Sequence, residues 1–128
     1  MNTSTVEPEI IELLDIFGFK RVEAHILVYL LVYQKGTSRM IEREMKLRQP
    51  EVSLGTSNLV TKNIITMREL PIDHKGKGRP MVEYMLNGSR TETVKRIVQD
   101  ALEAIEMKKQ KIGGLERLLE NLPKGNQS

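Results

Sequence analysis

Cysteine is absent from the 128-residue sequence, and aromatic residues are few, three Tyr and two Phe. The lack of cysteine excludes disulfides, a thiol nucleophile and a zinc site with cysteine ligands. A core must therefore be built from Ile, Leu, Val and Met. No window approaches the roughly eighteen apolar residues of a membrane-spanning helix, and residues 1–9 lack the pattern of a signal peptide. We expect a soluble, cytoplasmic protein of one domain, or one domain with an extension.

Residues suited to catalysis and metal binding are also scarce. The two histidines, His25 and His74, stand far apart in the sequence, and neither has the spacing of a metal site. Residues 76–80 (GKGRP) lack the following helix and the GK[ST] sequence of a nucleotide-binding loop. We therefore predict that the chain is not an enzyme and that it uses neither a metal nor a cofactor.

Positive charge is concentrated in the middle third of the chain. Residues 1–45 carry 5 basic and 7 acidic side chains, residues 46–90 carry 8 and 4, and residues 91–128 carry 7 and 6. The net charge of +3 thus comes mainly from the central segment. Solvated lysines are the ordinary explanation of a basic surface, but a localised excess favours a polyanionic partner.

Two short helices joined by a tight turn are predicted within this central region and just before it. Ile41 and Met45 place apolar side chains on one side of a helix over residues 38–45. Gln49-Pro50-Glu51 is typical of a helix start, because proline lacks an N–H that would have no helical partner there and the glutamate complements the helix dipole. With residues 46–48 as the turn, the pattern indicates a helix-turn-helix unit.

The second of these helices, over residues 49–62, has a distinctive outward face. Val52, Leu59 and the Gly55-Thr56 pair fall on the side predicted to be buried. The other side carries short hydrogen-bonding side chains and no acid beyond the first turn, and such side chains can contact DNA base edges and phosphates. An ordinary polar helix face is the alternative. The candidate DNA-binding residues here are Arg48, Gln49, Pro50, Ser53, Leu54, Ser57 and Lys62.

Two further helices are predicted upstream of the helix-turn-helix unit. The first covers residues 8–17 and is ended by Gly18. The second covers residues 21–34, is strongly apolar and should be the most buried helix of the domain. We expect Lys35-Gly36 to end it, and Thr37 or Ser38 to cap the helix that follows.

A β-hairpin is predicted after the helix-turn-helix unit. Asn63 is expected in the left-handed conformation where the chain leaves the helix. Residues 64–72 and 81–86 then alternate in the manner of strands, around a basic, turn-forming tip at residues 74–80. The tip can be an ordinary solvated turn. In the functional interpretation Lys75 and Lys77 contact phosphates and Arg79 enters the minor groove.

This order of elements resembles that of winged-helix transcription regulators, in particular the archaeal and bacterial MarR and TrmB-like groups. GFKRVEAHILVYLL is similar to the helix that these proteins place before the motif, and LRQPEVS to the start of their recognition helix. The resemblance covers about residues 8–87. It implies an α+β fold, a winged helix-turn-helix domain with a two-stranded β wing. Thr56 and Asn63 depart from the pattern, because such helices usually carry leucine and glycine at these positions.

A long, coiled-coil-like C-terminal helix is predicted over residues 90–122, with apolar residues at alternating steps of four and three, a heptad pattern in which Lys108 is the one misfit. A domain of about 80 residues cannot cover the whole stripe, so we expect a homodimer; folding back onto the first two helices is the alternative. Gly113-Gly114 predicts a bend or a break, since glycine costs about 1 kcal/mol in a helix interior. The candidate dimerisation residues are Val94, Val98, Ala101, Ile105, Ile112, Leu115 and Leu119.

The sequence therefore predicts a winged-helix DNA-binding domain over residues 1–88, a dimerisation helix over residues 89–122 and a disordered tail over residues 123–128. The function expected of this arrangement is sequence-specific binding of double-stranded DNA by a homodimeric transcriptional regulator. The alternative is a winged-helix module for protein assembly, on which the basic surface is incidental.

Overall fold

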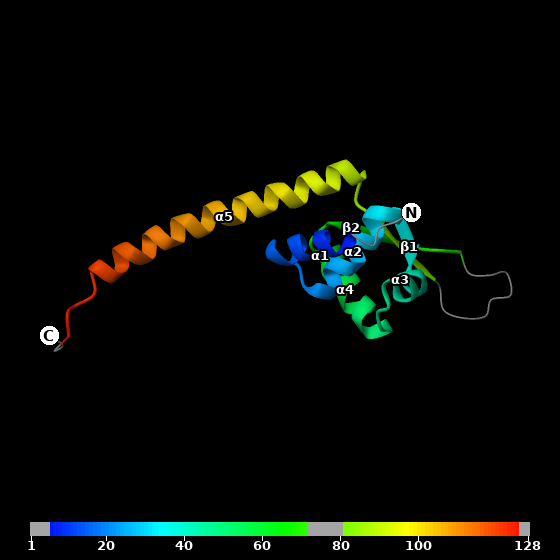
Figure 1. Cartoon of the computed structure of the whole chain (residues 1–128), viewed down its shortest axis with the longest axis horizontal. Coiled ribbons are helices and arrows are strands. Elements are labelled where there is room, and N and C mark those ends of the chain that lie inside the picture. The colour runs from blue at the N-terminus through cyan, green and yellow to red at the C-terminus, as the bar shows by residue number, and fades with distance from the viewer. Residues whose placement is uncertain (1–5, 72–80, 126–128) are drawn as a thin grey trace. The chain divides into compact units, whose positions relative to one another are not determined.

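The computed structural model of the chain describes residues 6–71 and 81–125, and within these ranges it forms five helices and three strands (Figure 1). The elements are α1 (Glu7–Ile16), α2 (Arg21–Tyr33), β1 (Lys35–Thr37), α3 (Ser38–Met45), α4 (Gln49–Thr61), β2 (Ile65–Glu69), β3 (Val82–Leu86) and α5 (Arg90–Glu120). The chain divides into two units, Met1–Thr93 and Val94–Ser128. No helix in the described ranges is both long enough and apolar enough to span a membrane.

The first unit is built around α2. Ala24, Ile26, Leu27 and Leu30 are fully buried, which confirms that this is the most buried helix. Other elements add fully buried side chains to the same unit, namely Ile41 from α3, Val52 and Leu59 from α4, and Ile65 from β2. The core thus consists mainly of aliphatic side chains, with Phe19 and Tyr29 as its buried aromatic residues.

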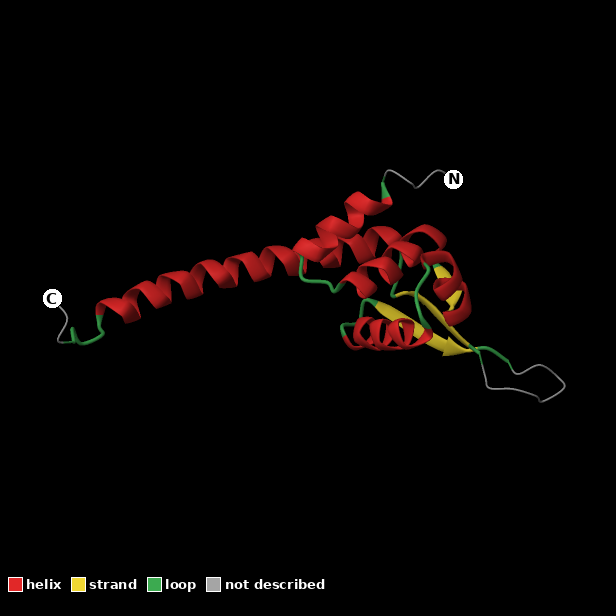
Figure 2. Cartoon of the chain, turned by 60° about the horizontal axis from the view of Figure 1, so that its bottom comes forward, coloured by secondary structure: helices red, strands yellow, loops and turns green. Residues whose placement is uncertain are grey.

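The described strands form one antiparallel sheet in the order β1-β3-β2 (Figure 2). The wing strands β2 and β3 pair from Ile65 opposite Leu86 to Glu69 opposite Val82, which confirms the predicted hairpin. The third strand was not predicted. Lys35-Gly36 does follow the end of α2, but its backbone pairs with β3 instead of forming a simple turn.

The ends of the helices follow the predicted pattern. Gly18, with φ +100°, ends α1, and the Phe19 N–H donates to the Leu14 carbonyl at 3.0 Å, which satisfies a helix-end acceptor. The Thr37 hydroxyl caps α3 by accepting from the Met40 N–H at 3.3 Å. Asn63 has φ 62°, the left-handed conformation predicted for it where the chain leaves α4.

Gly55 brings α4 very close to α2. A Cβ atom at this position would lie 2.5 Å from Ile26 Cδ1 and 3.0 Å from Val22 Cγ1, so a larger residue would force these two side chains to move. The neighbouring Thr56 is buried, and its hydroxyl donates to the Val52 carbonyl at 2.7 Å. This bond explains how a polar residue can occupy a core position of the helix.

The long C-terminal helix α5 runs from Arg90 to Glu120 without interruption. Of the two alternatives predicted at Gly113-Gly114, a bend or a break, the break is therefore wrong. A cost of about 1 kcal/mol per glycine is small beside the good helix-forming residues around the pair, such as Lys111, Leu115 and Glu116. A Cβ atom at either glycine would meet nothing within 4 Å, so no neighbouring group in the single chain requires a residue as small as glycine here.

Candidate nucleic-acid interface

The start of α4 is fixed by its own first turn. The Glu51 carboxylate accepts a hydrogen bond from the Arg48 N–H at 2.8 Å, and Pro50 occupies a position where no helical N–H is needed. Before it, Lys46 has φ 55°, and the Leu47 N–H donates to the Glu42 carbonyl at 3.0 Å. This short turn sets the angle between α3 and α4, and it confirms the predicted helix-turn-helix unit.

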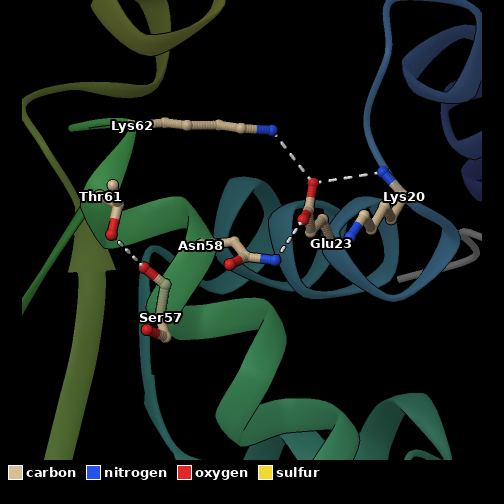
Figure 3. Close-up of polar contacts among 6 residues, drawn as sticks. All are labelled: Lys20, Glu23, Ser57, Asn58, Thr61 and Lys62. Carbon is tan, nitrogen blue, oxygen red and sulfur yellow. Dashed lines mark hydrogen bonds and ion pairs between the residues drawn. The ribbon is translucent and has the colours of Figure 1, made fainter.

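The outward face of α4 is exposed, as predicted. Leu54, an apolar residue, is 62% exposed on this face, where it contributes nothing to the core. The Thr61 hydroxyl donates to the Ser57 carbonyl at 3.0 Å, which leaves the Ser57 hydroxyl outside that bond (Figure 3). The exposed candidate residues at the start and along the face of this helix are Arg48, Gln49, Pro50, Ser53, Leu54 and Ser57.

Lys62 differs from the other candidate DNA-binding residues. Its ammonium lies 3.2 Å from a carboxylate oxygen of Glu23, on the neighbouring helix α2, and 4.9 Å from the centre of the Phe19 ring. Asn58, one helical turn earlier, donates to the other oxygen of Glu23 at 2.9 Å (Figure 3). The structure therefore turns these two side chains toward α2, whereas the sequence placed both on the outward face.

Glu23 is the buried acid that receives these contacts, with only 2% of its surface exposed. Burial by itself disfavours the charged carboxylate and raises the pKa. Hydrogen bonds from the Asn58 side chain, the Lys20 N–H and Lys62, together with the positive charge of Lys62, outweigh burial, so the pKa of Glu23 lies below its ordinary value of 4.5. The acid is therefore ionised at neutral pH, and the adjacent ammonium of Lys62 balances its negative charge.

Sequence reasoning missed two arginines on α3. Arg39 and Arg43 are both exposed and stand four residues apart, so they lie on the same side of the helix that precedes α4. They were not considered as DNA contacts because residues 1–45 as a whole carry a net negative charge. Their spacing on the polar side of the predicted helix was the signal that could have found them.

The wing strands are joined by an ion pair between their side chains. The Arg68 guanidinium lies 2.8 Å from a carboxylate oxygen of Glu83, directly across the β2–β3 pairing. Such cross-strand pairs stabilise a hairpin by a few tenths of a kcal/mol or more. The predicted contact residues Lys75, Lys77 and Arg79, together with His74, fall outside the described residues.

The second unit presents the apolar stripe predicted for α5. Six of the seven candidate dimerisation residues are exposed, by 42% at Val94 up to 60% at Ile112, and Ala101 is half-buried. In the described ranges no cluster of three or more His, Cys, Asp or Glu side chains could hold a metal ion. His25 lies on α2 with its Nδ1 2.7 Å from the Arg21 carbonyl oxygen.

No protein-family model matches the sequence, and no curated protein matches it by sequence comparison. Solved structures resemble it in fold. A transcriptional regulator homologue from Pyrococcus horikoshii OT3 is 19% identical, with a TM-score of 0.52 over 78% of this chain and 94% of the other. MepR, a transcription regulator of the Staphylococcus aureus multidrug efflux pump MepA, is 20% identical, with a TM-score of 0.51 over 94% and 93%. The S. aureus MepR–DNA complex is 20% identical, with a TM-score of 0.50 over 93% and 91%.

These similarities establish the fold. The chain has a winged-helix fold, with a small three-stranded sheet in the described residues and a long C-terminal helix, and it shares this fold with the structures above. The resemblance that the sequence suggested is thereby confirmed at the level of the fold. The structures that share it are transcription regulators, and one of them is a complex with DNA.

Proposed function

We propose that the protein is a sequence-specific DNA-binding transcriptional regulator that acts as a homodimer. In this proposal α4, over about residues 49–62, enters the major groove and the wing tip, over about residues 74–80, meets the minor groove. The proposal divides the chain into a DNA-binding domain over residues 1–88, a dimerisation helix over residues 89–122 and a tail over residues 123–128.

One observation carries this proposal, namely the outward face of α4. Its inward face is fully buried at Val52 and Leu59, so the helix is held rigidly, while its outward side chains are exposed and short. Beyond Glu51 in the first turn this face carries no acid that would repel a phosphate backbone. A rigid helix with short polar side chains suits the major groove, which admits an α-helix and displays donors and acceptors on base edges.

The candidate residues have two different roles in this proposal. Gln49 makes the base contact, because its amide can bond twice to an adenine, and Ser53 and Ser57 make shorter hydrogen bonds. Leu54 supplies an apolar surface of the kind that contacts a thymine methyl group. Arg48, at the helix start, contacts phosphates, and the exposed Arg39 and Arg43 of α3 are further candidates for such contacts.

The wing contributes a second set of contacts. Lys75 and Lys77 bind phosphates, and Arg79 enters the minor groove, whose negative potential attracts arginine most strongly where the groove is narrow. The Arg68–Glu83 pair supports this role by joining the two strands that lead to the tip.

Dimerisation rests on α5. Its apolar side chains repeat at steps of four and three from Val94 to Leu119, with Lys108 as the one interruption, and all of them except Ala101 are exposed. A two-stranded coiled coil buries such a stripe against a second copy. The dimer then presents two α4 helices to two half-sites, which requires an operator with approximate twofold symmetry.

Selection from a random duplex library tests the proposal. The full chain should enrich one sequence with two related half-sites, and its affinity should fall steeply as salt rises, because phosphate contacts release counterions. Failure to bind any duplex at low salt would contradict the proposal and favour a module for protein assembly. Binding to all duplexes equally would leave a DNA-binding protein without sequence specificity.

A further inference from the structure

Glu23 is a charged side chain that is almost completely buried in the first unit. Acidic side chains are rarely fully buried unless they are paired, and this one receives three hydrogen bonds. One comes from the Lys20 N–H at 3.2 Å, at the start of α2 itself. The other two come from Asn58 and Lys62, 35 and 39 residues further along the chain.

The two distant donors lie on the same side of one helical segment. Asn58 and Lys62 are four residues apart, at the last turn of α4 and its C-terminal cap, so both can reach a single carboxylate. Each bonds to a different oxygen of Glu23 (Figure 3). This bidentate arrangement fixes the end of α4 against the start of α2, which restricts rotation of α4 about its own axis.

The same contact compensates the charge of Lys62. Its ammonium is paired with a carboxylate and sits over the Phe19 ring, although 45% of its side-chain surface is exposed. Opposite charges at this distance, with one partner buried, attract more strongly than an exposed pair in water. A lysine that keeps this contact does not neutralise a phosphate and so releases no counterion from the DNA.

We infer that Glu23 is a positioning residue for the DNA-reading helix, which anchors the end of α4 through Asn58 and holds the Lys62 ammonium away from the phosphates. This inference rests on the proposed function. It assigns Lys62 to an internal contact, in place of the DNA contact that the sequence predicted. It also confines the phosphate and base contacts of α4 to Arg48 and to the residues from Gln49 to Ser57.

A salt titration of the full chain on one duplex tests the inference. Lys62→Met should leave the slope of log affinity against log salt unchanged, because the lysine makes no phosphate contact. Glu23→Gln should keep the bond from the Lys20 N–H and release the ammonium toward the duplex. The slope should then become steeper by roughly 0.9 per protomer, the value of one added phosphate contact.

The double variant Glu23→Gln/Lys62→Met tests whether the released Lys62, and not the loss of the Glu23 charge itself, makes the slope steeper. It should return the slope to the wild-type value, because the released lysine is no longer present. Glu9→Gln, at an exposed position of α1, makes the same change of net charge and should leave the slope unchanged. A merely structural role of Glu23 would alter stability in melting curves without moving the slope.

Two results would overturn the inference. One is a slope that becomes shallower by about 0.9 per protomer in Lys62→Met, since Lys62 would then contact phosphates in the native protein. The other is an unchanged slope in a folded Glu23→Gln protein. If Glu23→Gln fails to fold, Lys62→Met alone decides. If no variant and no wild-type protein binds the duplex, the proposed function fails instead.

Discussion

Helices α4 and α5 are both amphipathic, yet their apolar faces have different surroundings. Val52 and Leu59 of α4 are fully buried, whereas Ile105, Ile112 and Leu115 of α5 are each more than half exposed. Helix-period patterning in the sequence marks an apolar face on both helices, more weakly on α4 than on α5. A periodic apolar stripe in a sequence therefore marks which face of a helix is apolar. It does not tell whether other elements of the same chain bury that face.

This contrast separates the two tasks of the proposed regulator. The buried face of α4 belongs to the stability of one chain and holds the DNA-reading surface in place. For the exposed face of α5 we propose that a second copy of the chain covers it. Substitutions on the two helices should therefore change different measured quantities.

The largest effect is expected for Leu59→Ala. Removing a fully buried leucine side chain loses its transfer free energy and leaves a cavity, so the free energy of unfolding should fall by about 2–5 kcal/mol. Chemical denaturation of the full chain measures this loss. A loss below about 1 kcal/mol would mean that α4 is not packed as described.

Ile105→Ala should weaken association rather than folding of the first unit. If the stripe of α5 is buried in a dimer, each protomer loses up to about 1.5 kcal/mol of apolar burial, because full burial contributes about 1.5–3 kcal/mol and Ile105 is 52% exposed in the single chain. Sedimentation equilibrium should show a higher dissociation constant, and Lys109→Ala, at an exposed position off the stripe, should leave it unchanged. A dimer of unaltered affinity in Ile105→Ala would place the interface elsewhere.

Glycine substitutions in the two helices should have opposite signs. Gly55→Ala brings a Cβ atom against Ile26 and Val22. Overpacking of this kind lowers the free energy of unfolding by about 1–3 kcal/mol. The better helix propensity of alanine returns about 1 kcal/mol, so the net effect should be a loss of up to about 2 kcal/mol. Gly113→Ala meets no neighbour in the single chain and should stabilise α5 by up to about 1 kcal/mol. Thermal melting of both variants checks the signs, and a stabilising Gly55→Ala would contradict the close approach of α2 and α4.

A smaller effect is expected from acid. The pKa of Glu23 is lowered in the folded state, so its ionised form contributes stability that is fully present above its ordinary value of 4.5 and is lost as the pH falls through the folded value. Glu23→Gln lacks this contribution at every pH. Its deficit in melting temperature should therefore be largest near neutral pH and shrink below pH 4.5. A deficit that stays constant across this range would exclude Glu23 as the group that titrates.

Much of the first unit could be predicted because local sequence decides it. The bounds of α3, the turn at residues 46–48 and the start of α4 follow from proline, capping residues and apolar spacing. Gly18 and Asn63 likewise take the left-handed conformations that their types favour. Each of these features depends on interactions within a few residues.

The features that sequence reasoning missed depend on distant partners. Strand β1 has only three residues and exists because β3, some fifty residues later, supplies its hydrogen bonds. The internal role of Asn58 and Lys62 depends in the same way on Glu23, more than thirty residues earlier. Helical spacing placed both side chains on the outward face, and the position of a single acid on α2 turned them toward that helix instead.

The most direct test of the central claim is the base preference of Gln49→Ala and Ser53→Ala. Both side chains lie exposed on α4, so substitution should leave folding and most nonspecific affinity intact. Competition binding of the preferred duplex against its single-base variants should show that each substitution abolishes preference at particular positions, with about 1–3 kcal/mol lost for a bidentate contact. If both variants instead bind every duplex more weakly by the same factor, the outward face of α4 contacts only the backbone and does not read the sequence.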